Sequence, residues 1–365
     1  MIREAWPALR VFLWSRLALW ALAAATVLAF EDRLNPRRGQ WDTPRLHELG
    51  AAVDVWARWD SNWYLRIAES GYDWPSVTPA FFPLYPLLVG GLGRVLGGSF
   101  LLAGLVVSLT ASAAAFVLLH RLVLRHLERP VASRTLLYLA LFPTSLFLGA
   151  VYNESLFLAL AVATFLLAER GRPGWASVVT GLALLTRAQG VALLPALAVF
   201  AWRSANRRRN LALLAVPVAM FLAFPVVLEL WVGHGLAFLD AQTVWERSLA
   251  PLGPLGGLVQ AIGEGDVVGP LLAVSMLVLA VVAWRLLGAP YGAYAVAALA
   301  IPMAVPSERL GGLYSFPRFA LVAFPCLVAL AVVGRDRRVH LAVTAVLATG
   351  LAINVVRWAL WYWVA

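Results

Sequence analysis

Residues 58–86 read RWDSNWYLRIAESGYDWPSVTPAFFPLYP, and the first half of this stretch predicts an amphipathic helix. Apolar side chains recur there at three- and four-residue spacing, which places them on one helical face: Val55, Trp56, Trp59, Trp63 and Ile67. Asp60 follows Trp59, so we expect its carboxylate at the edge of that face. Gly71 predicts the end of the helix, because glycine readily adopts the left-handed conformation that closes one. A helix of this kind lies on a membrane surface, with Asp60 between lipid and water.

The composition of the whole chain is that of a membrane protein. Of 365 residues, 62% are hydrophobic and 13% are charged, which excludes a soluble globular protein and predicts an all-α polytopic membrane protein. The formal net charge is +10, but the basic residues lie in loops between apolar segments, so no nucleic-acid partner is expected. All 29 basic residues are arginine, which favours a bacterial source with a GC-rich genome.

Apolar segments predict about eleven transmembrane helices in one domain that covers residues 1–365. These segments are residues 9–30, 100–124, 136–151, 156–168, 176–185, 191–202, 211–232, 268–287, 293–305, 319–333 and 340–364. Residues 81–96 are also apolar, but prolines and glycines interrupt them, so we expect a re-entrant or surface segment there. The long polar loop between the first two spans, residues 31–99, carries the motif and the surface helices.

The distribution of arginine predicts the orientation. Arginines crowd the connections at 121–134, 203–209 and 335–338, whereas the short loops on the other side hold only Arg187, Arg247, Arg309 and Arg318. Because cytoplasmic loops carry the positive excess, the N-terminus is expected in the cytoplasm and Asp60 at the outer face of a bacterial plasma membrane. We find no internal repeat, which argues against the transporters that are built from repeats.

The sequence RWDSNWYLRIAESGY, followed by AFFPLYPLL, resembles the signature of the PIG-V mannosyltransferase family of the GT-C superfamily. The matching positions are Arg58, Trp59, Asp60, Trp63, Tyr64, Ile67, Ala68, Gly71, Tyr72, Ala80, Phe81, Phe82, Pro83 and Pro86. The resemblance implies a GT-C fold and an inverting transfer of mannose from a polyprenyl-phosphate donor, without a metal or other cofactor. One position departs from the pattern: eukaryotic members carry a glutamate between Gly-Tyr and Phe-Phe-Pro, and this chain has Asp73, displaced toward the tyrosine.

Three charged residues are candidates for the chemistry of such a transfer. Asp60 is the candidate general base on the acceptor hydroxyl, a role that carboxylates commonly take. Its alternative is a solvated aspartate on a loop between two membrane spans. Arg187 and Arg318 are candidates for the donor phosphate, since the guanidinium fork stays charged and can bind two oxygens. An arginine at membrane depth is costly and therefore suggests function. The alternative for both is an interfacial position in which the guanidinium reaches the water.

Further residues are candidates for lining the substrate pocket: Arg58, Trp59, Tyr64, Tyr72, Asp73, Phe82, Tyr85, Asn153, Glu154 and Gln242. Asn153 or Ser155 has an alternative as the N-cap of the next helix. Gln242, near Trp245, has an alternative in an interfacial tryptophan belt. No group of His, Cys, Asp and Glu has metal-ligand spacing, so no metal site is expected.

The partners that this interpretation implies are a polyprenyl-phosphate-sugar donor, membrane lipid, and an acceptor that the sequence leaves open between glycan, lipid and protein. Two alternative functions remain at this point. The chain could be a transporter or flippase for a lipid-linked sugar, or a non-catalytic membrane subunit of the same fold. The outer-face position of the polar residues favours the enzyme, because transporters place such residues near the middle of the membrane.

Overall fold

The computed structural model describes residues 2–364, and among these residues it contains helices and no strand, as the apolar pattern predicts. The α-helices are α1 (Ile2–Ala29), α2 (Ala51–Asp54), α3 (Ser61–Ser70), α4 (Leu84–Val95), α5 (Phe100–Val123), α6 (Arg129–Leu141), α7 (Glu154–Glu169), α8 (Pro173–Leu184), α9 (Leu193–Arg203), α10 (Arg207–Ala212), α11 (Ala215–Val232), α12 (Ala237–Asp240), α13 (Pro254–Gly263), α14 (Val268–Leu287), α15 (Ala289–Ala304), α16 (Phe316–Ala320), α17 (Phe324–Val333) and α18 (Arg337–Ala359). Short 3-10 helices are η1 (Glu31–Arg33), η2 (Arg38–Gln40), η3 (Pro44–Leu46), η4 (Thr78–Ala80), η5 (Ser145–Leu148), η6 (Ala188–Ala192) and η7 (Ala241–Trp245).

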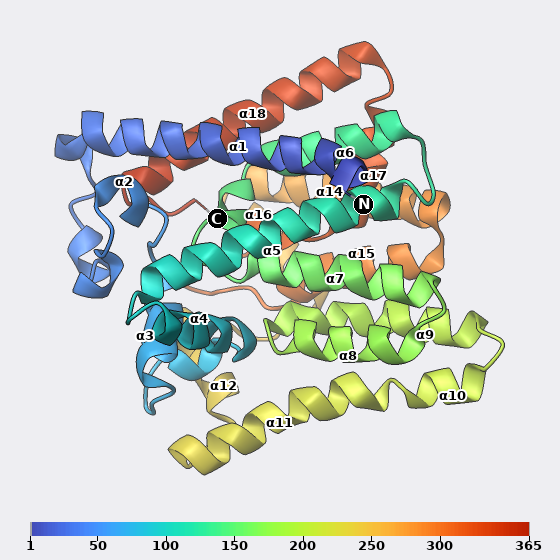
Figure 1. Ribbon diagram of the computed structural model, residues 1–365, viewed down its shortest axis with the longest axis horizontal. Helices are drawn as coiled ribbons and strands as arrows, with labels where there is room; N and C mark the ends of the chain where they lie inside the picture. Colours follow the sequence, from blue (N-terminus) through green and yellow to red (C-terminus); the bar gives the residue numbers. More distant parts are fainter. Residues whose placement is uncertain (1, 365) are drawn as a thin grey trace.

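The long helices pack side by side and give the molecule two distinct ends (Figure 1). Helix α5 packs against α1 and α7, α7 packs against α8, and α8 packs against α11. Helices α2, α3, α4 and α12 lie together at one end, on the left in the figure. The N-terminus and the arginine-rich connection between α9 and α10 lie at the opposite end. The predicted outer loop and the predicted cytoplasmic loops are therefore separated by the length of the helices.

In the part of the chain that the structure describes, five helices are long and apolar enough to cross a membrane. They comprise Ala5–Ala29, Phe100–Val123, Arg207–Val232, Val268–Leu287 and Arg337–Ala359. Other apolar helices, such as α8, α9 and α17, are shorter than the roughly 20 residues that a complete crossing needs. The polytopic membrane class is thus confirmed, and the number of eleven crossings stays a prediction.

Two predicted spans are wrong as single helices, and proline accounts for both interruptions. The span expected over 136–151 ends with α6 at Leu141, because Pro143 disfavours a helical conformation at Phe142, whose ψ is 137°. The span expected over 319–333 is divided into α16 and α17, with Pro325 in the first turn of α17, where it cannot donate to the preceding turn. The interruption after α6 leaves irregular backbone beside the first loop, where the backbone nitrogen of Val151 donates to the carbonyl oxygen of Trp56.

The helix predicted through the first-loop motif is also interrupted. Helix α2 ends at Asp54, α3 begins at Ser61, and between them Trp59 has a φ of 54°, in the left-handed region. Helix α3 ends before Gly71, as predicted. Its apolar face, which includes the buried Tyr64, packs on α4 and α5 inside the protein. The expectation that this face lies in lipid is therefore wrong.

The first loop is held against the last helix of the chain. Trp358 of α18 donates from its indole nitrogen to the carbonyl oxygen of Val55 over 2.7 Å, and both residues are fully buried. Asn35 also contacts the residues that follow α18. Its backbone nitrogen donates to the carbonyl oxygen of Leu360, and its Nδ2 donates to that of Trp361. The motif therefore belongs to a packed core and not to a mobile surface loop.

Candidate active site

Asp60 occupies the position just before α3, but its side chain does not cap that helix. Its backbone N–H donates to the hydroxyl of Tyr152 over 3.0 Å, and that hydroxyl donates to the carbonyl oxygen of Arg58. Tyr152 comes from the segment between η5 and α7, so this segment fixes the backbone at Asp60. The Asp60 carboxylate, whose side chain is 20% exposed, is free to face the neighbouring helices.

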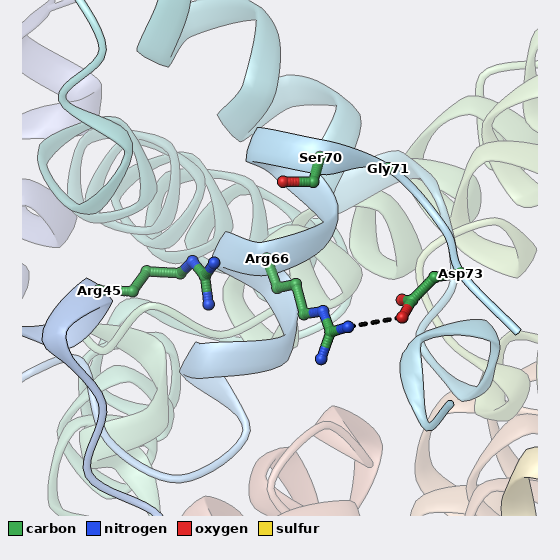
Figure 2. Close-up of a pocket in the computed structure, with 5 residues that line it drawn as sticks. All are labelled: Arg45, Arg66, Ser70, Gly71 and Asp73. Carbon is green, nitrogen blue, oxygen red and sulfur yellow. Dashed lines mark hydrogen bonds and ion pairs between the residues drawn. The ribbon is translucent and has the colours of Figure 1, made fainter. Parts of the chain in front are cut away.

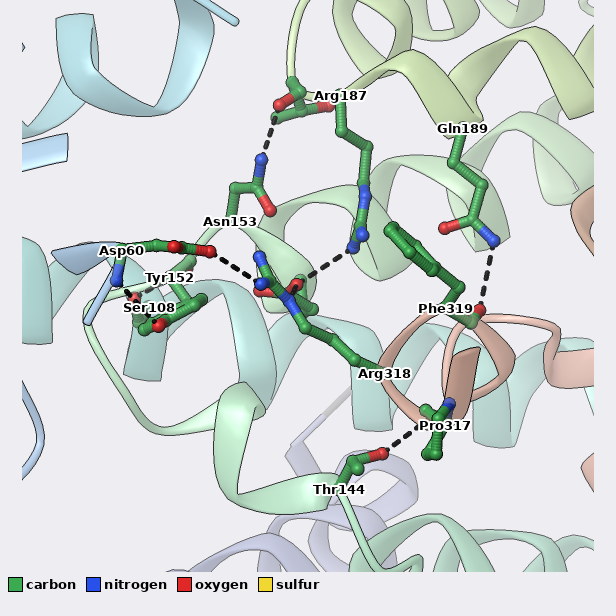
Figure 3. Close-up of polar contacts among 12 residues, drawn as sticks. Asp60, Ser108, Thr144, Tyr152, Asn153, Arg187, Gln189, Pro317, Arg318 and Phe319 are labelled. Carbon is green, nitrogen blue, oxygen red and sulfur yellow. Dashed lines mark hydrogen bonds and ion pairs between the residues drawn. The ribbon is translucent and has the colours of Figure 1, made fainter. Parts of the chain in front are cut away.

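Four charged side chains from four separate segments meet next to the start of α3, and three of them are labelled in Figure 3. Arg318 of α16 donates from Nη1 to Oδ2 of Asp60 over 2.7 Å, and from Nε to Oε1 of Glu154. Arg187, between α8 and η6, donates from Nη1 to the same Glu154 oxygen over 3.1 Å. We call Asp60, Glu154, Arg187 and Arg318 the ion cluster. It is a chain of alternating charges that ends at the carboxylate of Asp60.

The ion cluster is shielded from solvent except at Asp60. The Arg187 and Arg318 side chains are 7% and 8% exposed, and that of Glu154 is fully buried. This burial contradicts the interfacial alternative for the two arginines, which requires their guanidinium groups in water. Two carboxylates balance two guanidinium groups, and such attraction is strong where water is excluded. The cluster therefore holds the orientation of Asp60.

Aromatic rings line the guanidinium groups. The Arg318 guanidinium carbon lies 4.7 Å from the centre of the Tyr152 ring and 5.2 Å from that of Phe147. The corresponding distance from Arg187 to the Phe319 ring is 5.1 Å. Ring faces attract cations most where water is absent, so these contacts stabilise the buried charge.

Asn153 connects the start of α7 with the Arg187 loop. Its Nδ2 donates to the carbonyl oxygen of Thr186 over 2.6 Å, and it makes no side-chain cap to α7, so the capping alternative is wrong for it. The loop is tight: a Cβ at Gly190 would lie 2.7 Å from the Cα of Leu184. Among the described contacts, Oδ1 of Asn153 and Oε2 of Glu154 are buried without a hydrogen-bond partner.

Two further residues lie next to the ion cluster although neither was predicted to line the site: Gln189, and Arg247, which stood out only as one of the few arginines in short loops. Gln189 donates from Nε2 to the carbonyl oxygens of Ala298 and Phe319, and so ties the Arg187 loop to α15 and α16. Arg247 lies over the Phe319 ring at 5.7 Å. The sequence did single out Arg247 in one respect, because it is one of four arginines in the short loops predicted to lie at the outer face. Gln189 had no local signal, because its partners are backbone atoms distant in sequence.

Tyr64 is a pocket candidate that lies beside the ion cluster. Its ring packs edge-on against Tyr152, with centroids 5.9 Å apart. Burial raises the pKa of the Tyr64 hydroxyl well above its ordinary value; the nearby Arg318 opposes this rise, and Glu154 and Asp60 add to it. Tyr64 therefore remains neutral at physiological pH and can donate a hydrogen bond, but it is no base.

Other pocket candidates are packed into the framework that supports α3. Tyr72 donates to the carbonyl oxygen of Phe81, Tyr85 donates to that of Gly104, and Phe82 packs against Phe224. All three candidates are buried. None of the three forms a described hydrogen bond with the ion cluster, and their contacts hold the segments around α3 together.

Asp73 lies at the other end of α3 from Asp60. It accepts from Nη2 of Arg66 over 2.5 Å and from the hydroxyl of Thr78 over 2.8 Å. Together with Arg45, Arg66, Ser70 and Gly71 it lines a separate cavity of about 380 Å³ (Figure 2). The structure thus separates Asp73 from Asp60 and places Glu154 beside Asp60 instead.

The remaining candidates flank the site. Trp59 packs against Trp41, Trp361 and Trp363, and the Arg58 guanidinium lies 4.3 Å from the Trp361 ring centre. These contacts form an aromatic wall next to Asp60, built partly from residues 361–363. Gln242 lies half-buried in η7, without a described hydrogen bond to the ion cluster. Within the described residues, no three His, Cys, Asp or Glu side chains come close enough to hold a metal ion.

Comparison with known proteins confirms the resemblance stated from the motif. The family model described as "Mannosyltransferase (PIG-V)" matches residues 49–223, which include Asp60, Glu154 and Arg187 and exclude Arg247 and Arg318. The chain is 37% identical over 152 residues to GPI alpha-1,6-mannosyltransferase 2 of Mus musculus, an alignment that covers 37% of this chain and 30% of that protein. It is 38% identical over 132 residues to the protein of the same name from Rattus norvegicus, covering 33% of this chain and 26% of that protein.

The alignments therefore span about a third or less of the curated relatives. Among solved structures, the archaeal oligosaccharyltransferase AglB from Archaeoglobus fulgidus, in complex with an inhibitory peptide and a dolichol-phosphate, matches with a TM-score of 0.44. That match has 13% sequence identity and covers 95% of this chain and 55% of the other.

Proposed function

We propose that this chain, which is similar to the PIG-V mannosyltransferases over residues 49–223, is a membrane glycosyltransferase of the GT-C type. It transfers mannose from a polyprenyl-phosphate donor to an acceptor hydroxyl, with inversion at the sugar carbon. The observation that carries the proposal is the ion cluster. A partly exposed carboxylate is held at the edge of a buried pair of arginines, where a hydroxyl and a phosphate can be bound side by side.

In the proposed step, Asp60 accepts the proton of the acceptor hydroxyl. Oδ2 of Asp60 is occupied by Arg318, so Oδ1 is the oxygen available to that proton. The acceptor oxygen forms a bond to C1 of the sugar as the bond from C1 to the phosphate oxygen breaks. One displacement on the face opposite the phosphate inverts the configuration at C1.

Arg187 and Arg318 stabilise the phosphate that leaves. Negative charge grows on the phosphate oxygen as the bond to C1 breaks, and fixed guanidinium donors stabilise it without reorganising at the moment of reaction. Each arginine uses only some of its N–H groups on the ion cluster, so donors remain for the phosphate. The buried, unpaired oxygens of Asn153 and Glu154 are suited to accept hydrogen bonds from the sugar hydroxyls.

A transfer assay tests this function. Purified wild-type protein in nanodiscs, given polyprenyl-phosphate-mannose with a labelled sugar and a membrane extract as the source of acceptor, is expected to move the label to a new product and release polyprenyl phosphate. The new glycosidic bond should have the anomeric configuration opposite to that of the donor. Intact donor carried across liposomes without any transfer would identify a flippase and contradict the proposal.

The orientation is part of the same proposal: the Asp60 end of the molecule faces outward from a bacterial plasma membrane and the N-terminus lies in the cytoplasm. The arginine distribution supports it, and so does the separation of the two ends in Figure 1. In a Cys326→Ala background, a membrane-impermeant maleimide added to intact cells is expected to label Gln40→Cys but not Ala205→Cys. Both positions are exposed, so permeabilised cells should label both. The reverse labelling pattern would show that the orientation is inverted.

A further inference from the structure

The ion cluster has no net charge, which limits what it can attract. Asp60 and Glu154 neutralise Arg187 and Arg318 through direct ion pairs. A donor phosphodiester carries one negative charge, so the two carboxylates offset part of the attraction that the two arginines exert on it. A further positive charge close to the ion cluster would strengthen binding of the anion.

Arg247 supplies a charge of this kind. Its guanidinium carbon lies 5.7 Å from the centre of the Phe319 ring, and that of Arg187 lies 5.1 Å from the same centre. Burial lowers the pKa of Arg247, and the charges of Arg318 and Asp60 are near enough to act on it as well. Arg247 thus reaches the ion cluster from the segment that follows η7.

The Arg247 guanidinium lacks a counter-ion. Its Nη2 donates a hydrogen bond to the carbonyl oxygen of Tyr314 over 3.5 Å, which is long and therefore weak for such a bond. Among the side chains that the structure describes, no carboxylate forms an ion pair with it, and the adjacent Glu246 lies 3.9 Å from Arg309 instead. Because a half-buried charge without a partner is costly, an anion bound at this position would be stabilised.

Backbone contacts hold Arg247 where it is. Its segment forms an antiparallel bridge with Ser307, whose hydroxyl donates to the carbonyl oxygen of Trp245 over 2.6 Å. Glu308 donates from its backbone nitrogen to the carbonyl oxygen of Glu246 over 3.1 Å. The guanidinium is therefore positioned before any ligand arrives, which lowers the entropic cost of binding.

We propose that Arg247 binds the phosphate of the lipid-linked sugar donor and gives the site its net positive charge. This proposal rests on the proposed function, because the ligand is the donor of the proposed transfer. Arg247 is assigned to the phosphate of that donor. Its ligand is a phosphate attached to a polyprenyl chain, with or without the sugar. Arg247 lies outside the stretch that matches the family model, so the assignment comes from the geometry alone.

Binding of polyprenyl phosphate, which lacks the sugar, tests the contact directly. In phosphatidylcholine nanodiscs, Arg247→Gln is expected to weaken binding by about 10- to 100-fold, the usual effect of removing a charge-assisted hydrogen bond. Arg247→Lys should retain part of the affinity, because it keeps the charge but not the fork. The matched control is Arg309→Gln, which removes an exposed arginine near the same site and should leave binding unchanged.

Two outcomes would overturn the proposal. One is wild-type affinity for polyprenyl phosphate in folded Arg247→Gln protein, or in folded Arg247→Ala protein if the first variant does not fold. The other is displacement of polyprenyl phosphate by an equal concentration of phosphatidylglycerol, which would identify a general site for membrane phospholipid. Arg247-dependent binding in a wild-type protein that transfers no sugar would instead contradict the proposed function and leave the Arg247 contact standing.

Discussion

Asp60→Asn is expected to slow sugar transfer by about 10²–10⁴-fold, the usual contribution of a general base. Asparagine has nearly the same shape and can still accept a hydrogen bond from Nη1 of Arg318, but it cannot take up a proton at neutral pH. The protein should remain folded, since the Asp60 side chain is partly exposed and makes no helix cap. Donor binding should also persist, because the proposed phosphate contacts come from arginines.

Single-turnover transfer and donor binding, measured side by side on wild-type and variant protein, separate these effects. The matched control is Asp73→Asn, which removes a carboxylate from the same first loop but from the separate cavity at the far end of α3. That variant is expected to transfer at close to the wild-type rate. A full transfer rate in Asp60→Asn protein would end the assignment of Asp60 as the base.

Glu154→Gln is expected to have the largest effect on stability. Glu154 is fully buried and its Oε1 accepts from both Arg187 and Arg318. Neutralising it leaves two buried guanidinium groups with the single carboxylate of Asp60. Removing one partner from a buried ion pair typically lowers the free energy of unfolding by about 3–5 kcal/mol. Transfer should fall as well, because Arg318 would no longer be fixed relative to Asp60.

Thermal unfolding of wild-type and Glu154→Gln protein in detergent measures this loss of stability. The matched control is Glu69→Gln, which breaks an ion pair of 2.8 Å with Arg45 on the protein surface; its effect should be about 0–1 kcal/mol. The double variant Glu154→Gln with Arg187→Met should recover part of the stability, since the uncompensated charge is removed. Equal melting temperatures for wild type and Glu154→Gln would show that the ion pairs contribute no net stability.

The features that the sequence predicted correctly depend on contacts close along the chain or on solvent preference. Apolar runs identified α1, α5 and α14 as membrane helices, because a helix in lipid satisfies its own backbone hydrogen bonds. The end of α3 before Gly71 likewise depends on the conformational freedom of one residue, whose φ is 81°. The motif around Asp60 was found because its residues are adjacent in sequence.

The errors arose where packing between distant segments overrides a local pattern. The spacing of Val55, Trp59 and Ile67 fits one helix, yet the chain turns at Trp59 to bring this residue against Trp361 and Trp363. Tyr72, Phe82 and Tyr85 match the family signature, but their position in the chain does not reveal that neighbouring helices enclose them. The residues predicted to line the pocket therefore included some that only support the packing around α3.

By itself, the sequence determined that this is a helical membrane protein, that its long first loop carries the motif, and that Asp60, Arg187 and Arg318 are unusual charges. Only the tertiary structure decided that Arg318 joins Asp60 to Glu154, and that Arg247 forms no ion pair with any carboxylate among the described side chains. The physical reason is that an ion pair is set by the distance between charged groups in space. Arg318 lies 258 positions from Asp60 and 164 from Glu154 along the chain, and no local rule of hydropathy or helix spacing relates residues so far apart.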